Sequence, residues 1–147
     1  MDVRWSIKNF DELTNLELYN ILKLRMETFI VEQQCVYLDL DDMDQSAMHL
    51  FATVDGKLIA YTRIQINRLA VIRRVIVQQD FRKLRLGTEL MSKALEYINS
   101  LKNISHIELS AQFHLKKFYE NLGFHAVAEP YLDTGILHVK MIKQHDH

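Results

Sequence analysis

The strongest constraint on the fold of this chain is one strand–loop–helix–strand unit in its second half. Residues 69–77 are rich in β-branched side chains and predict a strand, and residues 87–101 place apolar side chains on one helical face. Residues 104–110 then alternate as a second strand. Two strands joined through a helix run parallel, by a right-handed crossover. The chain is therefore expected to contain at least one parallel strand pair.

The remaining elements add an antiparallel part to the expected sheet. Two strand-like runs, 48–54 and 58–66, are joined by Asp55-Gly56, which tolerates the positive φ angles of a tight hairpin. A capping box of Thr14 and Glu17 begins a helix of about 20 residues. The other expected elements are a strand at 3–7, a short helix at 115–122 closed by Gly123, and strands at 124–128 and 136–142. This order predicts an α/β or α+β protein with a mixed, mostly antiparallel sheet of about seven strands flanked by helices.

Length and composition narrow the class of protein. The 147 residues suffice for one domain, spanning 1–147, and hardly for two. A net charge of −1 gives no argument for a nucleic-acid partner, and no uncharged apolar stretch reaches the ~20 residues that span a bilayer. The N-terminal residues lack the pattern of a secretory signal, so we expect a cytoplasmic protein with no membrane partner. The lone Cys35 permits no internal disulfide and is expected to be a small buried apolar side chain.

A basic loop connects the strand 69–77 to the helix that begins at Gly87. The first turn of a helix offers unpaired N–H groups and a partial positive charge, which together bind anions. Arg82, Lys83 and Arg85 add positive charge there, so the loop predicts a phosphate-bearing ligand, with a solvated basic turn as the alternative. Neither G-x-x-x-x-G-K-[ST] nor G-x-G-x-x-G occurs, which disfavours an NTPase or a nicotinamide enzyme.

The same loop resembles the acetyl-CoA-binding motif of the GNAT acetyltransferases, [QR]-x-x-G-x-[GA], with Arg82 and Gly87 in its outer positions. Residues 118–124, F-Y-E-N-L-G-F, resemble the family's F-Y-x-x-x-G-F signature. The two motifs stand in the family's order with a strand between them, and the resemblance covers nearly the whole chain. Within the family, the chain is most similar to the ElaA-like proteins, in residues 24–25, 29–35, 49–50, 111–112 and 131–138.

The resemblance implies acetyl-CoA as co-substrate and a set of residues that hold it. The pyrophosphate would lie on the backbone N–H groups of residues 83–88, and the pantetheine arm would lie along the strand that precedes them. The implied cofactor-binding residues are Val75, Val77, Arg82, Lys83, Arg85, Leu86, Gly87, Thr88 and Gln112. Arg85 replaces the first glycine of the motif, so its side chain either crowds the loop or turns outward toward a phosphate.

The resemblance also implies the catalytic groups. Tyr119 matches the tyrosine that donates a proton to the departing sulfur, and a core aromatic is its alternative interpretation. The backbone N–H of Val77 is expected to stabilise the oxyanion. The general base is left open by the sequence, and no metal is implied. The candidates for the base are Glu32, Glu108, His49, His106, His138 and ordered water.

An acidic loop follows the first helix and carries Asp39, Asp41, Asp42 and Asp44. It fails the EF-hand pattern, which requires Gly at its sixth position and Glu at its twelfth. It is interpreted either as a solvated loop or as a wall that attracts a cationic amine. The C-terminal residues 145–147 are expected to be a disordered tail.

These observations favour an N-acetyltransferase that moves an acetyl group from acetyl-CoA to a primary amine, on a small molecule or a peptide, by direct attack in a ternary complex. The alternative is a catalytically weak acyl-CoA-binding or interaction module on the same fold, which Arg85 keeps open. A nucleic-acid-binding function has little support from a nearly neutral chain. The sequence does not identify the acceptor amine. It also does not decide the oligomeric state, for which a homodimer is one option.

Overall fold

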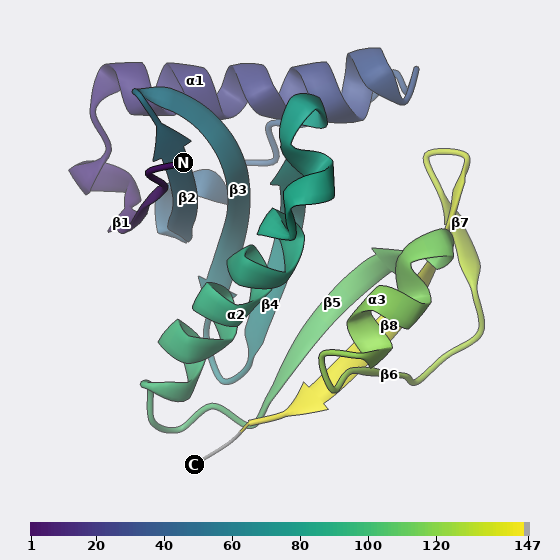
Figure 1. Ribbon diagram of the computed structural model, residues 1–147. Coiled ribbons are helices and arrows are strands. Elements are labelled where there is room, and N and C mark those ends of the chain that lie inside the picture. The colour runs from purple at the N-terminus through teal and green to yellow at the C-terminus, as the bar shows by residue number, and fades with distance from the viewer. Residues whose placement is uncertain (146–147) are drawn as a thin grey trace.

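The computed structural model describes residues 1–145, which form a mixed eight-stranded sheet with helices on both faces (Figure 1). The strands are β1 (Arg4–Asn9), β2 (Met48–Val54), β3 (Lys57–Ile66), β4 (Ala70–Val77), β5 (His106–Gln112), β6 (His125–Ala126), β7 (Tyr131–Asp133) and β8 (Ile136–Gln144). The helices are α1 (Asn15–Arg25), continued by a π-helical segment (Met26–Glu32), α2 (Leu86–Asn99) and α3 (Lys116–Glu120). The predicted fold class is confirmed, and β7 is the strand that the sequence did not predict.

The sheet divides into two halves at its parallel strand pair. Its order is β1-β2-β3-β4-β5-β8-β6, with β7 paired to β8, and the described pairs other than β4–β5 are antiparallel. Helix α2 makes the predicted crossover from β4 to β5. The parallel register extends only over Ala70–Ile72 against Ile107–Leu109. Beyond it the two strands diverge, so the sheet is forked (Figure 1).

A β-bulge in β4 lies where the fork begins. Tyr61 pairs with Ile76 but Arg63 pairs with Arg73, so β4 holds one more residue than β3 between these pairs. Arg74 lies in this interval with φ of +59°, a left-handed conformation that is uncommon for a side chain larger than glycine. A bulge bends its strand and increases its twist. We infer that the bulge helps to turn the end of β4 away from β5.

Two apolar layers hold the helices on the sheet. The larger layer, on one face, packs α2 and α3 against buried strand residues such as Ile72, Leu109 and Met141. The smaller layer packs α1 on the opposite face, through Ile21, Leu24, Phe51, Tyr61 and Ile76. Helices α2 and α3 therefore cover one face of the sheet, and α1 covers the opposite face over β2–β4 (Figure 1).

Local sequence signals explain where two elements begin and turn. The Thr14 hydroxyl accepts the Glu17 N–H at 3.0 Å and the Glu17 carboxylate accepts the Thr14 N–H at 2.9 Å, so the predicted capping box starts α1. Asp55 and Gly56 have φ of +50° and +78° and form the predicted β2–β3 hairpin. No helix within residues 1–145 is long and apolar enough to cross a membrane.

Candidate active site

A cleft of about 750 Å³ occupies the fork between β4 and β5. Residues of β4 and of the π-helical segment that extends α1 form one wall. Residues of β5, α3, β7 and β8 form the other. Segments of π-helix are frequent at functional sites, and here the segment brings Phe29 and Glu32 into the cleft.

The backbone of β4 presents unpaired groups to this cleft. Val77 pairs with Ala60, and the N–H of the next residue, Gln78, donates to Ile59 at 2.8 Å. Because antiparallel hydrogen bonds alternate, the N–H and C=O of Val77 itself point away from β3. The Val77 carbonyl indeed accepts the Nε–H of Arg82 at 2.9 Å instead of a β3 group. The N–H of Val77 is thus oriented toward the fork.

The turn into α2 explains the unusual position of Arg85. Residues Gln79–Leu84 form a 3-10 helix, and Arg85 follows with φ of +60° and ψ of +17°. Glycine adopts this conformation without a steric penalty, whereas other residues lose roughly 1–2 kcal/mol there. The Arg85 side chain is exposed and does not cap α2, which begins at Leu86, one residue before the predicted start. The side chain therefore points outward and leaves the first N–H groups of α2 without a side-chain partner.

Six of the predicted site residues line the cleft: Val75, Val77, Arg82, Gly87, Gln112 and Tyr119. The other four lie beside it, with Leu86 buried and Lys83, Arg85 and Thr88 exposed on the turn and first turn of α2. A Cβ added at Gly87 would meet the Phe118 ring at 3.6 Å, an ordinary contact, so the protein itself does not require a glycine there.

Tyr119 is both a core residue and a cleft residue. It is 5 % exposed, and its ring lies edge-on to Phe118 and Phe124 at 5.0 and 6.2 Å. Its hydroxyl has no hydrogen-bond partner among residues 1–145. Burial raises the pKa of Tyr119 to about 12, because the charged phenolate is poorly solvated. The phenol is therefore protonated at neutral pH, and its hydroxyl is present as a hydrogen-bond donor.

Three of the candidate bases lie outside the cleft. The Glu108 carboxylate lies 3.0 Å from His106 Nε2 and 3.5 Å from Lys140 Nζ on the strand surface. His49 is fully buried, between the Tyr61 hydroxyl at 2.7 Å and the Asp44 carbonyl at 2.9 Å. These contacts give all three side chains structural partners, and they do not favour a role in the cleft.

The other two candidates, Glu32 and His138, line the cleft. The Glu32 carboxylate is paired with Arg82 at 2.8 Å. His138 Nδ1 lies 2.7 Å from the Ile136 carbonyl, which can only accept, so Nδ1 carries the hydrogen. The neutral imidazole then keeps Nε2 as the nitrogen that accepts a proton. The geometry therefore favours His138 over Glu32 as the general base.

Both interpretations of the acidic loop are wrong for most of its carboxylates. Asp39 and Asp44 are 4 % and 6 % exposed, and the fully buried Arg25 bridges them at 2.8 and 2.7 Å. Arg63 and Arg74 complete a network with these carboxylates and with Asp41, at 2.7 to 3.4 Å. Its arginines lie on a helix and two strands far along the chain, which is why the sequence did not reveal it. Asp42 alone of the four is exposed.

The network also sets the ionisation of its acids. Burial would raise the pKa of Asp41, but hydrogen bonds from Arg63 and the Met43 N–H outweigh it and hold that pKa at about 2. The pKa of Asp44 is likewise lowered, since its bonds to Arg25 and Arg63 outweigh burial. The carboxylates remain charged and paired, and they are not available to attract a cationic substrate.

Several cleft residues were not among the predicted site residues. Tyr37, Arg73, Ser110, His114 and Tyr131 line the cleft. Period-two alternation on β5 would have placed Ser110 on the same face as Gln112. Residues 131–138 carried part of the family resemblance, but no pattern predicted the short strand that holds Tyr131. The Tyr131 hydroxyl is hydrogen-bonded to Ser110.

Two expectations about single residues are corrected. Cys35 is only partly buried, and its thiol donates to the Thr134 carbonyl at 2.9 Å, so it links the end of the first helix to the β7–β8 turn. His145 is buried, with Nε2 3.0 Å from the Ile98 carbonyl, and is not a disordered tail. Asp146 and His147 lie outside the described residues. Among residues 1–145 no three His, Cys, Asp or Glu side chains are placed to hold a metal.

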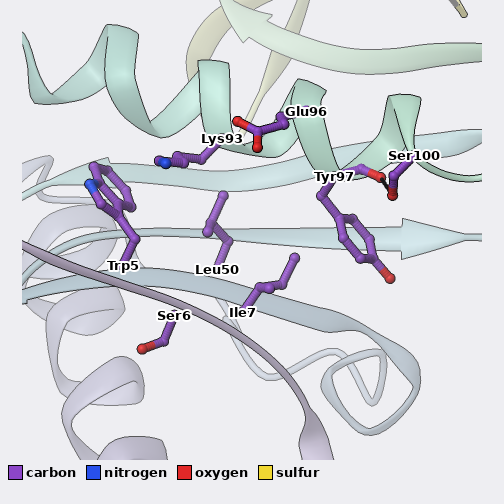
Figure 2. A pocket seen from close by; sticks show the side chains of 8 residues that line it. All are labelled: Trp5, Ser6, Ile7, Leu50, Lys93, Glu96, Tyr97 and Ser100. Carbon is purple, nitrogen blue, oxygen red and sulfur yellow. Dashed lines mark hydrogen bonds between the residues drawn. The ribbon is translucent and has the colours of Figure 1, made fainter.

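A second, smaller hollow of about 280 Å³ lies between β1 and α2 (Figure 2). Trp5 and Ile7 of β1 and Lys93, Glu96 and Tyr97 of α2 face one another across it. Its lining residues include no histidine or cysteine and a single carboxylate. It contains none of the residues that the family motifs predict for the site, whereas six of them line the fork, and the fork is the candidate active site.

A sheet forked after its parallel pair, with the open start of a helix at the mouth of the fork, is the acyl-CoA N-acyltransferase fold. The chain belongs to the GNAT acetyltransferase family, because the family's sequence model, described as "Acetyltransferase (GNAT) domain", matches residues 13–145. It is an acyltransferase by this membership, and the predicted ElaA-like affiliation is confirmed by the relatives that follow.

Protein ElaA of Escherichia coli is 36% identical over 97% of this chain and 97% of its own, and its crystal structure superposes with a TM-score of 0.92. An acyl-CoA N-acyltransferase from Pseudomonas aeruginosa is 38% identical over 97% of this chain and 99% of its own, also with a TM-score of 0.92. An aminoglycoside 6′-N-acetyltransferase complexed with coenzyme A shares the fold at 17% identity, with a TM-score of 0.70, covering 95% and 96% of the two chains.

Proposed function

We propose that this protein transfers the acetyl group of acetyl-CoA to a primary amine by direct attack in a ternary complex. One observation carries the proposal: the outward N–H of Val77, the protonated hydroxyl of Tyr119 and the imidazole of His138 all border the same cleft. These are a hydrogen-bond donor for an oxyanion, an acid and a base, the three groups that an acyl transfer to an amine requires.

The residues present fit acetyl-CoA. The uncapped start of α2, with Lys83, Arg85 and Thr88 on its turn, would hold the pyrophosphate. The pantetheine arm would lie along Val75 and Val77, with the outward Val77 N–H directed at the thioester carbonyl at the end of the arm. Gln112 would contact the arm from the opposite wall. The aminoglycoside acetyltransferase of the same fold, which was crystallised with coenzyme A, supports this assignment.

Bound acetyl-CoA supplies a thioester carbonyl that is activated toward amines. The N–H of Val77 donates to the carbonyl oxygen as negative charge develops there, an interaction worth about 3–4 kcal/mol in comparable sites. His138 Nε2 accepts the proton that the amine loses, and the Tyr119 hydroxyl donates a proton to the departing sulfur. Burial keeps Tyr119 protonated, because its raised pKa of about 12 places its deprotonation far above neutral pH.

The competing possibility is a weak acyl-CoA-binding or interaction module. The replacement of the motif glycine by Arg85 had suggested this module. The Arg85 side chain is exposed, however, and does not cover the backbone that the ligand would approach. The test is release of free thiol from acetyl-CoA in the presence of a panel of amines. Tyr119→Phe should lower kcat roughly 10²-fold while the KM for acetyl-CoA changes little. Tyr19→Phe, at an exposed tyrosine on α1, is the matched control. Absent thiol release would favour the module, whereas amine-independent release would indicate thioester hydrolysis and would contradict transfer to an amine.

A further inference from the structure

Arg73 differs from the other arginines that line the cleft. Arg74 is paired with Asp39 at 2.9 Å, and Arg82 is paired with Glu32 at 2.8 Å. The Arg73 side chain lines the same cleft but makes no ion pair or hydrogen bond within residues 1–145. Its positive charge is therefore not compensated by a protein carboxylate.

The strand register places Arg73 on a definite face of the fork. Ile72 and Leu109 are paired and buried in the layer beneath α2, so Arg73 and Ser110, the next residues along β4 and β5, project to the opposite face. His138 projects to that face too, because Val139 beside it belongs to the layer under α2. Arg73, Ser110 and His138 thus gather on one side of the fork.

Tyr119 and the start of α2 belong to the other side. Arg73 is four residues before Val77, which amounts to at most roughly 13 Å along the strand and to less across the bulge at Arg74, and Arg73 projects to the face opposite the start of α2. A pyrophosphate on the start of α2 is therefore out of reach of Arg73. Arg73 is exposed to the cleft, so a ligand group that it contacts would belong to the molecule that approaches His138, which is the acceptor.

We propose that Arg73 binds a carboxylate of the acceptor, so that the substrate is an amino acid or a similar carboxylate-bearing amine. This inference rests on the proposed acetyl transfer and names its substrate class. A guanidinium forms paired hydrogen bonds with a carboxylate, which fixes the distance between the carboxylate and the amine. Tyr37, Phe29 and Leu38 line the cleft as well and fit an apolar side chain.

The remaining charges of the cleft agree with this substrate class. The acids of the loop 39–44 that lie near the fork are bound by Arg25, Arg63 and Arg74, and Glu32 is bound by Arg82. Asp133, exposed on β7, is the other carboxylate among the residues that line the cleft. A polyamine would meet the uncompensated Arg73, whereas a carboxylate would be attracted by it.

The experiment compares amines that differ only in the carboxylate: L-phenylalanine with 2-phenylethylamine, and L-leucine with 3-methylbutylamine. Each is titrated into the protein saturated with coenzyme A, and each is also tested as acceptor with acetyl-CoA. The variants are Arg73→Gln, Arg73→Lys and the control Arg68→Gln, an exposed arginine outside the cleft. Arg73 has no side-chain partner within residues 1–145, so we expect each variant to keep the melting temperature of the parent protein.

The parent protein should bind at least one amino acid more than tenfold more tightly than its decarboxylated partner. Arg73→Gln should weaken binding of that amino acid by 10- to 100-fold, leave the partner amine within twofold, and leave acetyl-CoA binding unchanged. Arg73→Lys should restore part of the loss, and Arg68→Gln should have no effect.

Equal binding of both members of each pair, binding of neither, or equal losses for both in Arg73→Gln would overturn the assignment of Arg73. Failure of acetyl-CoA to bind or to release thiol would instead count against the proposed function. The two failures are therefore distinguishable.

Discussion

The buried network around Arg25 permits a quantitative prediction for Arg25→Met. Arg25 has no exposed surface, and it donates to the Asp39 carboxylate at 2.8 Å, the Asp39 carbonyl at 3.1 Å and the Asp44 carboxylate at 2.7 Å. Methionine keeps most of the length of the side chain but removes its charge and its donors. Two buried carboxylates would then lose their shared cation.

Removing one partner of a buried ion pair costs about 3–5 kcal/mol, because the other charge stays desolvated. Asp39 retains Arg74 and Asp44 retains Arg63, so the lower end of the range, about 3 kcal/mol, is expected. A chain of this length has an unfolding entropy of about 0.3 kcal/mol/K, so the melting temperature should fall by about 10 °C.

Urea unfolding and scanning calorimetry would measure both quantities. The control is Arg4→Met, since Arg4 and Asp2 form a pair of side chains that are 80% and 81% exposed. Exposed pairs contribute little, so this control should change the free energy of unfolding by less than about 0.5 kcal/mol. A loss below about 1 kcal/mol for Arg25→Met would refute the view that the network stabilises the loop 39–44.

Three further predictions follow from the geometry of the cleft and its supports. His138→Gln should lower kcat by about 10²-fold or more without changing the Kd of acetyl-CoA, as measured by turnover and calorimetry; equal losses in both would make His138 a binding residue. Arg85→Gly should raise the free energy of unfolding by about 0.5–1 kcal/mol, because the left-handed φ of +60° is relieved; a destabilised variant in urea would contradict that conformation. Asp41 has its pKa lowered to about 2, so its contribution to stability is present above about pH 4 and is lost as the pH falls toward 2. Melting curves of Asp41→Asn should therefore lie below those of the parent protein at pH 7 and converge with them near pH 2, and a constant gap would be inconsistent with the Arg63 pairing.

The sequence predicted those features that depend on neighbouring residues. The capping box of Thr14, the hairpin at Asp55 and the amphipathic face of α2 are set by residues within one or two turns. The family motifs led to the fork because both border it, with Gly87 at the start of α2 and Tyr119 on α3.

The features that the sequence did not predict depend on pairing over long distances. The bulge at Arg74 exists only as an offset between β3 and β4, so no local pattern shows it. The acidic loop looked solvated because its partners, Arg25, Arg63 and Arg74, lie on a helix and two strands. The three-residue strand β7 was missed because it forms only by pairing with β8.

The central claim is that the fork between β4 and β5 binds acetyl-CoA, and calorimetric titration of the protein with acetyl-CoA tests it most directly. Free coenzyme A and ATP serve as controls for the thioester and for phosphate charge alone. We expect micromolar binding of acetyl-CoA and coenzyme A and much weaker binding of ATP, because ATP lacks the pantetheine arm that we propose lies along β4 beside Val75 and Val77. Absence of binding by both coenzyme A species, or equal binding of ATP, would contradict it.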